Sequence, residues 1–162
     1  MDPSFEDFVK ARGEALLRFA LMLCADRGRA EDLVQTVLAR VGPRWHRIVT
    51  MDAPEAYVKT ALVHQHVTWW SRRSSREVPI AVPPERAGGD FAAARAERDA
   101  AWELLGRLAP RQRAVLVLRY YEDLPDGEIA AILGCTAATV RSQAARALAN
   151  LRTAFPAKEI TP

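Results

Sequence analysis

A single glycine, Gly134, separates two short segments near the C-terminus that both show the apolar periodicity of a helix. Asp126 is expected to cap the first helix and Thr136 the second, because both side chains can accept a backbone hydrogen bond. Glycine adopts the left-handed backbone conformation at little cost, so the chain can end one helix and reverse direction at Gly134. The apolar faces would be Ile129, Ala130, Ile132 and Leu133 in the first helix and Val140, Ala144, Ala147, Leu148 and Leu151 in the second. This spacing is typical of a helix-turn-helix.

The outward face of the second helix predicts a nucleic-acid partner. No acidic residue occurs between Glu128 and Glu159, so this face would carry only polar and basic side chains. A helix of this kind fits the major groove of DNA, where arginine pairs with guanine edges or phosphates. An ordinary helical hairpin with a solvated basic surface is the alternative, but the arginines coincide with the second helix of the motif. The outward residues are Thr139, Arg141, Ser142 and Arg146.

Nearly all of the remaining chain also has helical periodicity, so we expect an all-α fold of two small helical domains. The segment from Glu77 to Asp90 is rich in proline and glycine and has no amphipathic period, which is typical of a flexible linker. The expected organisation is a first domain over 1–75, the linker over 76–91, a second domain over 92–156 and a tail over 157–162. Helices are expected over 5–12, 14–24, about 29–41, 52–74, 91–106 and 110–121, followed by the helix-turn-helix pair.

Local signals fix two of these helix starts. Ser4 and Asp7 have the spacing of a capping box near the N-terminus. Asp52 is expected to cap the helix over 52–74, with Pro54 in its first turn and Glu55 in the third position.

The helix expected over 52–74 combines aromatic and basic residues, and no Asp or Glu occurs from Ala56 to Arg76. Aromatic rings can stack on exposed bases, worth about 1–3 kcal/mol per base, while cations hold the phosphates. This composition therefore favours single-stranded DNA. The alternative is that Tyr57, Trp69 and Trp70 are core residues. For one of the two tryptophans a core position is the favoured interpretation, since adjacent residues of a helix face different ways.

Several classes of protein are excluded by the sequence. The chain has no stretch of about 18 uncharged apolar residues and no signal peptide, so no membrane insertion and a cytoplasmic location are expected. Cys24 and Cys135 have no CxxC partner and are expected to be small buried residues of helices; no metal or other cofactor is expected. No nucleotide-binding or hydrolase motif occurs, and the adjacent carboxylates of Glu31 and Asp32 would diverge on a helix. We therefore expect no catalytic residue and no enzymatic activity.

Three motifs follow one another along the chain. They are Ala30-Glu-Asp-Leu-Val-Gln35; Pro54-Glu-Ala-Tyr-Val-Lys59 with Trp69-Trp70-Ser-Arg-Arg73; and Leu108-Ala-Pro-Arg-Gln-Arg-Ala-Val-Leu-Val-Leu-Arg119 with the helix-turn-helix after it. In this order and spacing they resemble the extracytoplasmic-function sigma factors of bacterial RNA polymerase, a two-domain group of the sigma-70 family. The likeness is greatest to the SigE-like group of actinobacteria, and it covers nearly the whole chain.

The resemblance implies a role for each motif. The first would dock on the RNA polymerase core enzyme through Glu31, Asp32 and Gln35, although an ordinary solvated surface is the alternative for this acidic face. The second would read and melt the promoter −10 element through Lys59, His64, Trp69, Trp70, Arg72 and Arg73. The third would read the −35 element through Thr136, Thr139, Arg141, Ser142, Ala145 and Arg146. His64 stands where the family often has asparagine, and an imidazole lacks the paired donor and acceptor of an amide.

The implied function is that of a sigma factor, which directs the core enzyme to specific promoters and assists in melting the −10 element. The implied partners are the core enzyme, double-stranded and melted promoter DNA and, as for many relatives, an anti-sigma factor. The alternative is an autonomous helix-turn-helix regulator that does not dock on polymerase. Such regulators usually bind two-fold sites as dimers, so the oligomeric state separates the two interpretations.

Overall fold

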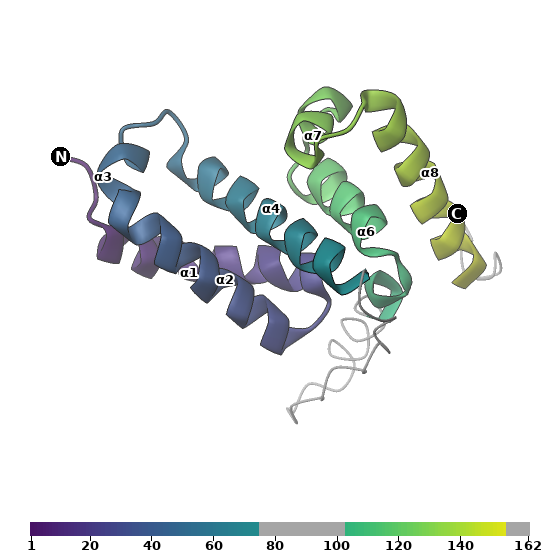
Figure 1. Ribbon diagram of the computed structural model, residues 1–162, viewed down its shortest axis with the longest axis horizontal. Helices are drawn as coiled ribbons and strands as arrows, with labels where there is room; N and C mark the ends of the chain where they lie inside the picture. Colours follow the sequence, from purple (N-terminus) through teal and green to yellow (C-terminus); the bar gives the residue numbers. More distant parts are fainter. Residues whose placement is uncertain (75–102, 155–162) are drawn as a thin grey trace, which may run out of the picture. The chain divides into compact units, whose positions relative to one another are not determined.

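The computed structural model describes residues 1–74 and 103–154, and every regular element in these ranges is a helix (Figure 1). The expected all-α fold class is therefore confirmed. The chain divides into two compact units, Met1–Pro79 and Ile80–Pro162, and each has its own core. The domain and linker boundaries expected near 75, 91 and 156 fall at or beyond the edges of the described ranges and stay predictions. No helix described here is long and apolar enough to cross a membrane.

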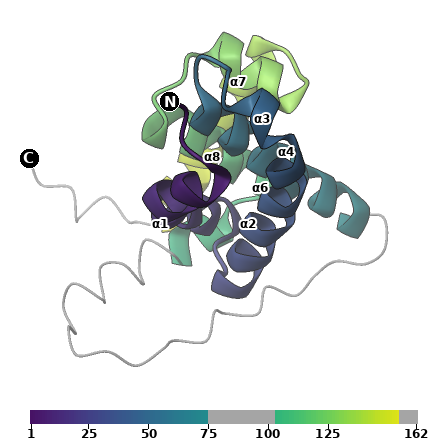
Figure 2. The same cartoon turned by 90° about the vertical axis from the view of Figure 1, so that its left-hand side faces the viewer.

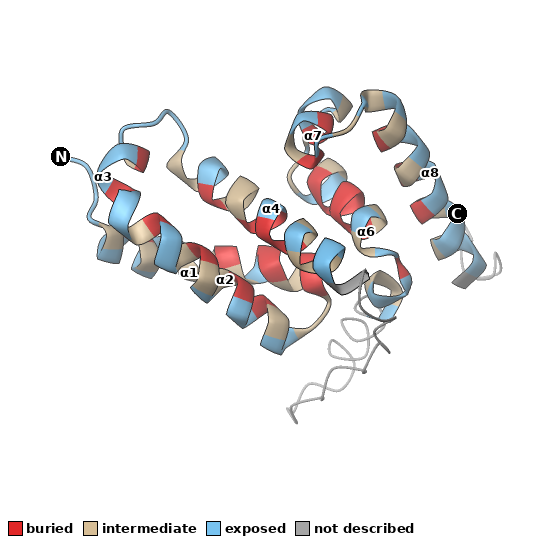
Figure 3. Cartoon of the chain, viewed as in Figure 1, coloured by how far each residue is buried: buried red, intermediate tan, exposed pale blue. Residues whose placement is uncertain are grey.

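The first unit is built around three long helices that pack against one another. Its elements are α1 (Phe5–Cys24), α2 (Arg27–Val41), η1 (Gly42–Arg44), α3 (Trp45–Ile48) and α4 (Pro54–Ser74). Figure 3 shows the buried residues on the facing sides of the long helices. Buried apolar side chains from all three fill the core: Leu16, Phe19, Leu23, Leu33, Val58, Leu62 and Val63. Because α2 and α4 lie side by side (Figure 1, Figure 2), their outward sides can form one surface.

α1 is one continuous helix, although the sequence predicts two helices that meet near Gly13. The prediction was wrong because the buried side chains of Phe8 and Leu16 lie on either side of the glycine and both pack against the unit. A glycine inside a helix costs about 1 kcal/mol relative to alanine, and this burial offsets the cost. The expected capping box is confirmed: Ser4 Oγ accepts a hydrogen bond from Asp7 N at 3.1 Å, and Ser4 N donates to Asp7 Oδ2 at 3.3 Å.

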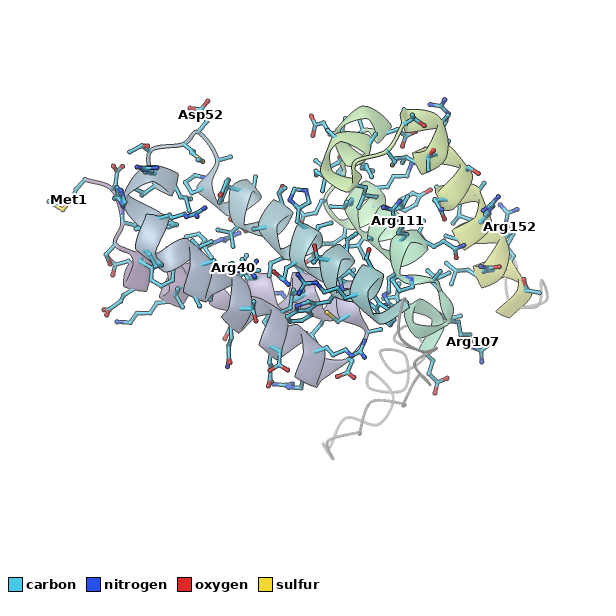
Figure 4. The ribbon with its side chains drawn as sticks, viewed as in Figure 1. Met1, Arg40, Asp52, Arg107, Arg111 and Arg152 are labelled. Atoms are coloured by element: carbon cyan, nitrogen blue, oxygen red, sulfur yellow. The ribbon has the colours of Figure 1, made fainter. Side chains whose placement is uncertain are left out.

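Two helix starts differ from the sequence prediction. α2 begins two residues early, at residue 27 rather than 29, because Asp26 caps it by accepting a hydrogen bond from Arg29 N at 3.3 Å. α4 begins at Pro54, so Asp52 lies outside the helix and points outward from the preceding loop (Figure 4). Glu55 is consequently the second residue of α4 rather than the third. The proline, with its fixed φ and missing N–H, is suited to the first helical position.

The described part of the second unit contains a helical stretch over 103–107, α6 (Pro110–Leu116), η2 (Val117–Tyr121), α7 (Asp126–Leu133) and α8 (Ala137–Ala154). α8 packs against both α6 and α7. The buried apolar residues of this core include Val115, Leu116, Ile129, Val140, Ala144 and Ala147. The helix predicted over 91–106 lies mostly outside the described residues, which begin again at 103.

The helix predicted over 110–121 changes its hydrogen bonding at Val117. From Val117 to Tyr121 it is a π-helix, and the turn closes with Glu122 N donating to Val117 O at 3.1 Å. Tyr120 and Tyr121 both lie at the surface of this wider turn. Single π turns inside helices are frequent near functional sites, and this one directly precedes the helix-turn-helix.

The helix-turn-helix is confirmed as α7 and α8. Gly134 ends α7 in the left-handed region, with φ 69° and ψ 38°. Thr136 Oγ1 accepts a hydrogen bond at 3.1 Å from the backbone N–H three residues on, as a capping residue does. Asp126 does not cap α7, because Pro125 occupies the cap position and the carboxylate instead accepts a hydrogen bond from Arg119 at 3.1 Å. The carboxylate is therefore used in a charge-assisted bond to Arg119 of η2.

The two cysteines have different environments. Cys24 is buried at the end of α1, as expected, and its sulfur lies 3.8 Å from His66 Nδ1. Cys135 is partly exposed in the turn after Gly134, so the prediction of a buried helical residue was wrong. α7 ends before Cys135, and Cys135 N donates to Ala130 O at 3.0 Å, which closes the last turn of α7. Within residues 1–74 and 103–154, no cluster of side chains could hold a metal ion.

Candidate nucleic-acid interface

The outer side of α8 carries the side chains that the sequence assigns to a recognition helix. Arg141, Ser142, Ala145 and Arg146 are exposed, whereas Val140, Ala144 and Ala147 are buried in the core. Thr136 and Thr139 lie at the start of the helix, where their hydroxyl oxygens are 3.0 Å apart. The two threonines therefore shape the N-terminus of α8. The exposed four lie at spacings that place them on one side of the helix, free of the core.

Further basic residues of the second unit lie outside the helix-turn-helix pattern that the sequence analysis followed. Arg107, Arg111 and Arg152 are all exposed, and Figure 4 labels them. They belong to the stretch over 103–107, to α6 and to the end of α8. Only the fold shows that helices other than α8 also present cations, and such cations can hold phosphates without reading a base.

In the first unit, α2 presents the acidic face expected to dock on a protein. Glu31, Asp32 and Gln35 are exposed, and Leu33 is fully buried behind them. Glu31 accepts a hydrogen bond from Arg27 at 3.0 Å, so one of the two carboxylates is already partnered within the helix. Asp32 has different surroundings, because its side chain lines a depression near the end of α4.

This depression brings together residues from the two sets that the sequence kept apart. It has a volume of about 320 Å³ and is lined by Cys24, Arg29, Asp32, His66, Trp69, Trp70 and Arg72. The Arg29 guanidinium lies 5.0 Å from the Trp70 ring centroid, and the ring of His66 meets Trp70 edge-on at 6.2 Å. Both tryptophans are partly buried, and neither is a fully buried core residue. Trp70 is nevertheless held in one orientation by its neighbours.

Lys59, which the sequence grouped with the −10 residues, faces a different part of the unit. Its ammonium lies 3.4 Å from the Glu55 carboxylate and 5.6 Å from the ring centroid of Phe19. Glu55 also accepts a hydrogen bond from Arg12 of α1 at 2.5 Å. Burial raises the pKa of Glu55, but the hydrogen bond from Arg12 and the charges of Lys59 and Arg12 outweigh burial and lower the pKa. This cluster joins α4 to α1.

A second depression runs between α2 and α4, and we name it the α2–α4 groove. Its larger part, about 290 Å³, is lined by Arg40, Ala61, His64, Gln65, Thr68 and Arg72. Its smaller part, about 120 Å³, is lined by Val37, Arg40, Val41, Arg44, Ile48, Tyr57 and Ala61. The two parts adjoin, because Arg40 and Ala61 line both. Arginines occur along the whole groove and no lining residue is acidic, so its charge suits a polyanion.

Arg40 and Gln65 join the two walls of the groove. Arg40, labelled in Figure 4, reaches from α2 and donates a hydrogen bond from Nη1 to Gln65 Oε1 on α4. The sequence analysis missed Arg40, Arg44 and Gln65. Arg40 lies near the end of α2 and Arg44 lies in η1 beyond Gly42 and Pro43, so spacing along one helix did not connect them. Gln65 gave no signal, because only the packing of α2 on α4 brings it to the groove.

Of the expected −10 residues, His64 and Arg72 line the α2–α4 groove, and Trp69, Trp70 and Arg72 line the depression beside Asp32. Arg72 belongs to both and connects them. Lys59 lines neither. The backbone of Arg73 is helical, but its side chain lies outside the described part of the structure.

Known proteins are similar to this chain in sequence and in fold. Residues 98–151 match the family described as sigma-70, region 4. The chain is 40% identical over 156 residues to the RNA polymerase sigma-E factor of Streptomyces coelicolor. This alignment covers 96% of this chain and 88% of that protein. It is 30% identical over 145 residues to the ECF RNA polymerase sigma factor SigL of Mycobacterium tuberculosis. This alignment covers 85% of this chain and 80% of that protein.

A solved structure has the same fold. It is the sigma factor RpoE from Bartonella quintana, in complex with the anti-sigma factor NepR, and it matches with a TM-score of 0.68 and 22% identity over 95% of this chain and 98% of that one. The sequence similarity to sigma-E factors extends over both units and includes the helix-turn-helix and the α2 and α4 segments. The chain belongs to the extracytoplasmic-function family of RNA polymerase sigma factors.

Proposed function

We propose that this chain directs the RNA polymerase core enzyme to specific promoters, with the second unit reading the −35 element and the first unit reading and helping to melt the −10 element. The observation that carries the proposal is the 40% identity to a sigma-E factor over 96% of the chain. The chain would act by binding, as an initiation factor and not as an enzyme. It would act in the cytoplasm, where promoter DNA and polymerase are found.

The −35 element would be bound by the outer side of α8. Arg141 and Arg146 are exposed and can donate to guanine edges or to phosphates. Ser142 can donate or accept, while the methyl group of Ala145 can only contact a thymine methyl or the local shape of the groove. Thr136 and Thr139 would support the N-terminus of α8, the end of a recognition helix that approaches the bases.

The melted −10 strand would follow the surface of α4. His64 and Arg72 line the α2–α4 groove, and Trp69 and Trp70 offer partly exposed rings on which bases can stack. We assign Lys59 a structural part in this surface, because it pairs with Glu55 within α4 and its ammonium lies 5.6 Å from the Phe19 ring of α1. Arg73 stays a proposed phosphate contact, and its position in the sequence is the reason for the proposal.

Docking on the core enzyme would use the acidic face of α2, formed by Glu31, Asp32 and Gln35. These side chains are exposed over a rigid support, since Leu33 beneath them is fully buried. An anti-sigma factor is a further proposed partner, because the similar RpoE protein was solved in complex with one.

Run-off transcription with purified core enzyme from the source organism tests the proposal. A genomic DNA fragment library serves as template, and the 5′ ends of the transcripts are mapped. We expect start sites that occur only when the chain is added and that share two upstream elements. If the chain instead binds DNA as a stable dimer and leaves the start sites of polymerase unchanged, it is an autonomous regulator.

A further inference from the structure

Gln65 is a buried amide whose two polar ends have different surroundings. It is 6% exposed and lines the larger part of the α2–α4 groove. Its Oε1 accepts the hydrogen bond from Arg40 Nη1. Among the hydrogen bonds of the described residues, none engages its amide nitrogen, which is left to donate to a ligand in the groove.

Arg40 fixes which end of the amide faces the groove. A guanidinium carries only donors, so it can bind the amide oxygen of Gln65 but not the nitrogen. An amide without such a partner can turn over and offer either a donor or an acceptor. Held by Arg40, Gln65 offers a donor alone. The hydroxyl of Thr68 is also directed, since it donates to His64 O at 2.8 Å.

At the base position that carries either a keto oxygen or an amino group, a donor in a groove lined by arginines suits the keto class. The arginines hold the phosphates of a single strand, and the amide donor then meets the edge of a base. Thymine and guanine carry a keto oxygen where cytosine and adenine carry an amino group. The keto oxygen accepts a hydrogen bond from the Gln65 amide, whereas an amino group would place two donors face to face.

We infer that Gln65, oriented by Arg40, selects thymine or guanine over adenine or cytosine at one position of the melted strand. The inference rests on the proposed function, because that function supplies the single strand. In these terms Gln65 is a specificity-determining residue, and Arg40 is a positioning residue that acts through it.

The test uses the full chain with core enzyme and a pool of promoter templates whose −10 element is randomised. Transcripts are sequenced to give the base preference at each position. We expect the wild-type chain to enrich keto bases at one position. Gln65→Glu keeps an oxygen for Arg40 but replaces the donor by an acceptor, so the preference at that position should change toward amino bases by a factor on the order of 10. Gln112→Glu is the matched control, because Gln112 Oε1 accepts a comparable bond from Asn150 at 3.0 Å in the second unit.

Two variants of Arg40 test its positioning role. Arg40→Lys keeps a donor for Gln65 Oε1 and should keep the keto preference, whereas Arg40→Met frees the amide to turn and should remove it. Circular dichroism and thermal unfolding show whether each variant is folded. If the wild type selects a −10 sequence and folded Gln65→Glu selects the same one, the inference is overturned while the proposed function stands. If the wild type selects no −10 sequence, both fail.

Discussion

Arginines of this chain differ in the partner that each guanidinium meets within its own unit. Arg12 binds a carboxylate of α4, Arg119 binds the carboxylate of Asp126, and Arg29 lies over an indole ring. These side chains contribute to the fold. Arg141 and Arg146 differ from them, because they project from α8 and no hydrogen bond or ion pair engages them in the described part of the chain. Arginines that look alike in the sequence therefore have different roles, and the group that each guanidinium contacts distinguishes these roles.

Replacing Arg141 or Arg146 by alanine should weaken binding to the −35 element by about 1–3 kcal/mol where the side chain reads a base. Stability should hardly change, because both positions are exposed and alanine favours a helix. The measurement is transcription by the holoenzyme from templates with single changes in the −35 element. Arg18→Ala, an exposed arginine of α1, is the matched control. Unchanged −35 preference and affinity in both variants would show that α8 is not the reader.

Glu55→Gln should lower the free energy of unfolding at neutral pH. It should also make that free energy depend less on pH in the acidic range. The pKa of Glu55 lies below its usual value of 4.5 in the folded protein, so the charged carboxylate favours the folded state. This contribution is complete above about pH 4.5 and is lost as the pH falls through the lower folded value. Thermal unfolding of both chains at a series of pH values measures it, and the gap between them should narrow on acidification. Glu14→Gln, at an exposed position of α1, is the control. A gap that stays constant with pH contradicts the prediction.

At the scale of elements, apolar periodicity predicted the helices well, and their ends less well. The turn at Gly134 and the cap at Thr136 were predictable, because both depend on residues adjacent in sequence. The unbroken course of α1 through Gly13 was not, since packing from other helices decides it. The candidate site follows the same division. The outer side of α8 was readable from spacing, whereas the pairing of Arg40 with Gln65 depends on how α2 meets α4.

The stability changes on replacing Gly127 within α7 and Gly134 at its C-terminal cap by alanine should have opposite signs. Gly134 has a φ of +69°, so Gly134→Ala should cost about 1–2 kcal/mol of stability, although no atom lies within 4 Å of the added Cβ. Gly127 also has open space around it but lies within α7 and has no positive φ. Gly127→Ala should therefore stabilise the chain by about 0.4–1 kcal/mol. Calorimetric unfolding of the two variants gives both values. Equal signs would mean that backbone conformation does not control this turn.

At the scale of the whole molecule, each unit offers only a small surface to a promoter. One helix in one groove gives limited specificity, and a second reader on the same chain multiplies its effect through effective concentration. We therefore expect the free chain to bind promoter DNA weakly and the holoenzyme to bind it tightly. Gel-shift titrations with and without core enzyme measure the difference, and tight binding by the free chain would contradict it.

Asp32→Arg should abolish promoter-directed transcription and association with the core enzyme while the chain stays folded. The side chain is exposed, so the reversed charge should disturb the docking surface and not the core. Co-purification with core enzyme is the measurement, with circular dichroism as the check on folding. Glu14→Arg reverses a charge at an exposed position of α1 and is the matched control. Normal co-purification of the Asp32 variant would remove α2 from the docking surface.

Asp32 and the two tryptophans line the same depression at the end of α4. A protein bound along α2 and a strand bound along α4 would therefore touch a common set of side chains, and their affinities would not be independent. Thermodynamic reciprocity then applies: if occupancy of one face strengthens the other by some factor, the reverse effect has the same size. The factor by which bound polymerase changes the affinity for opened DNA would equal the factor by which opened DNA changes the affinity for polymerase.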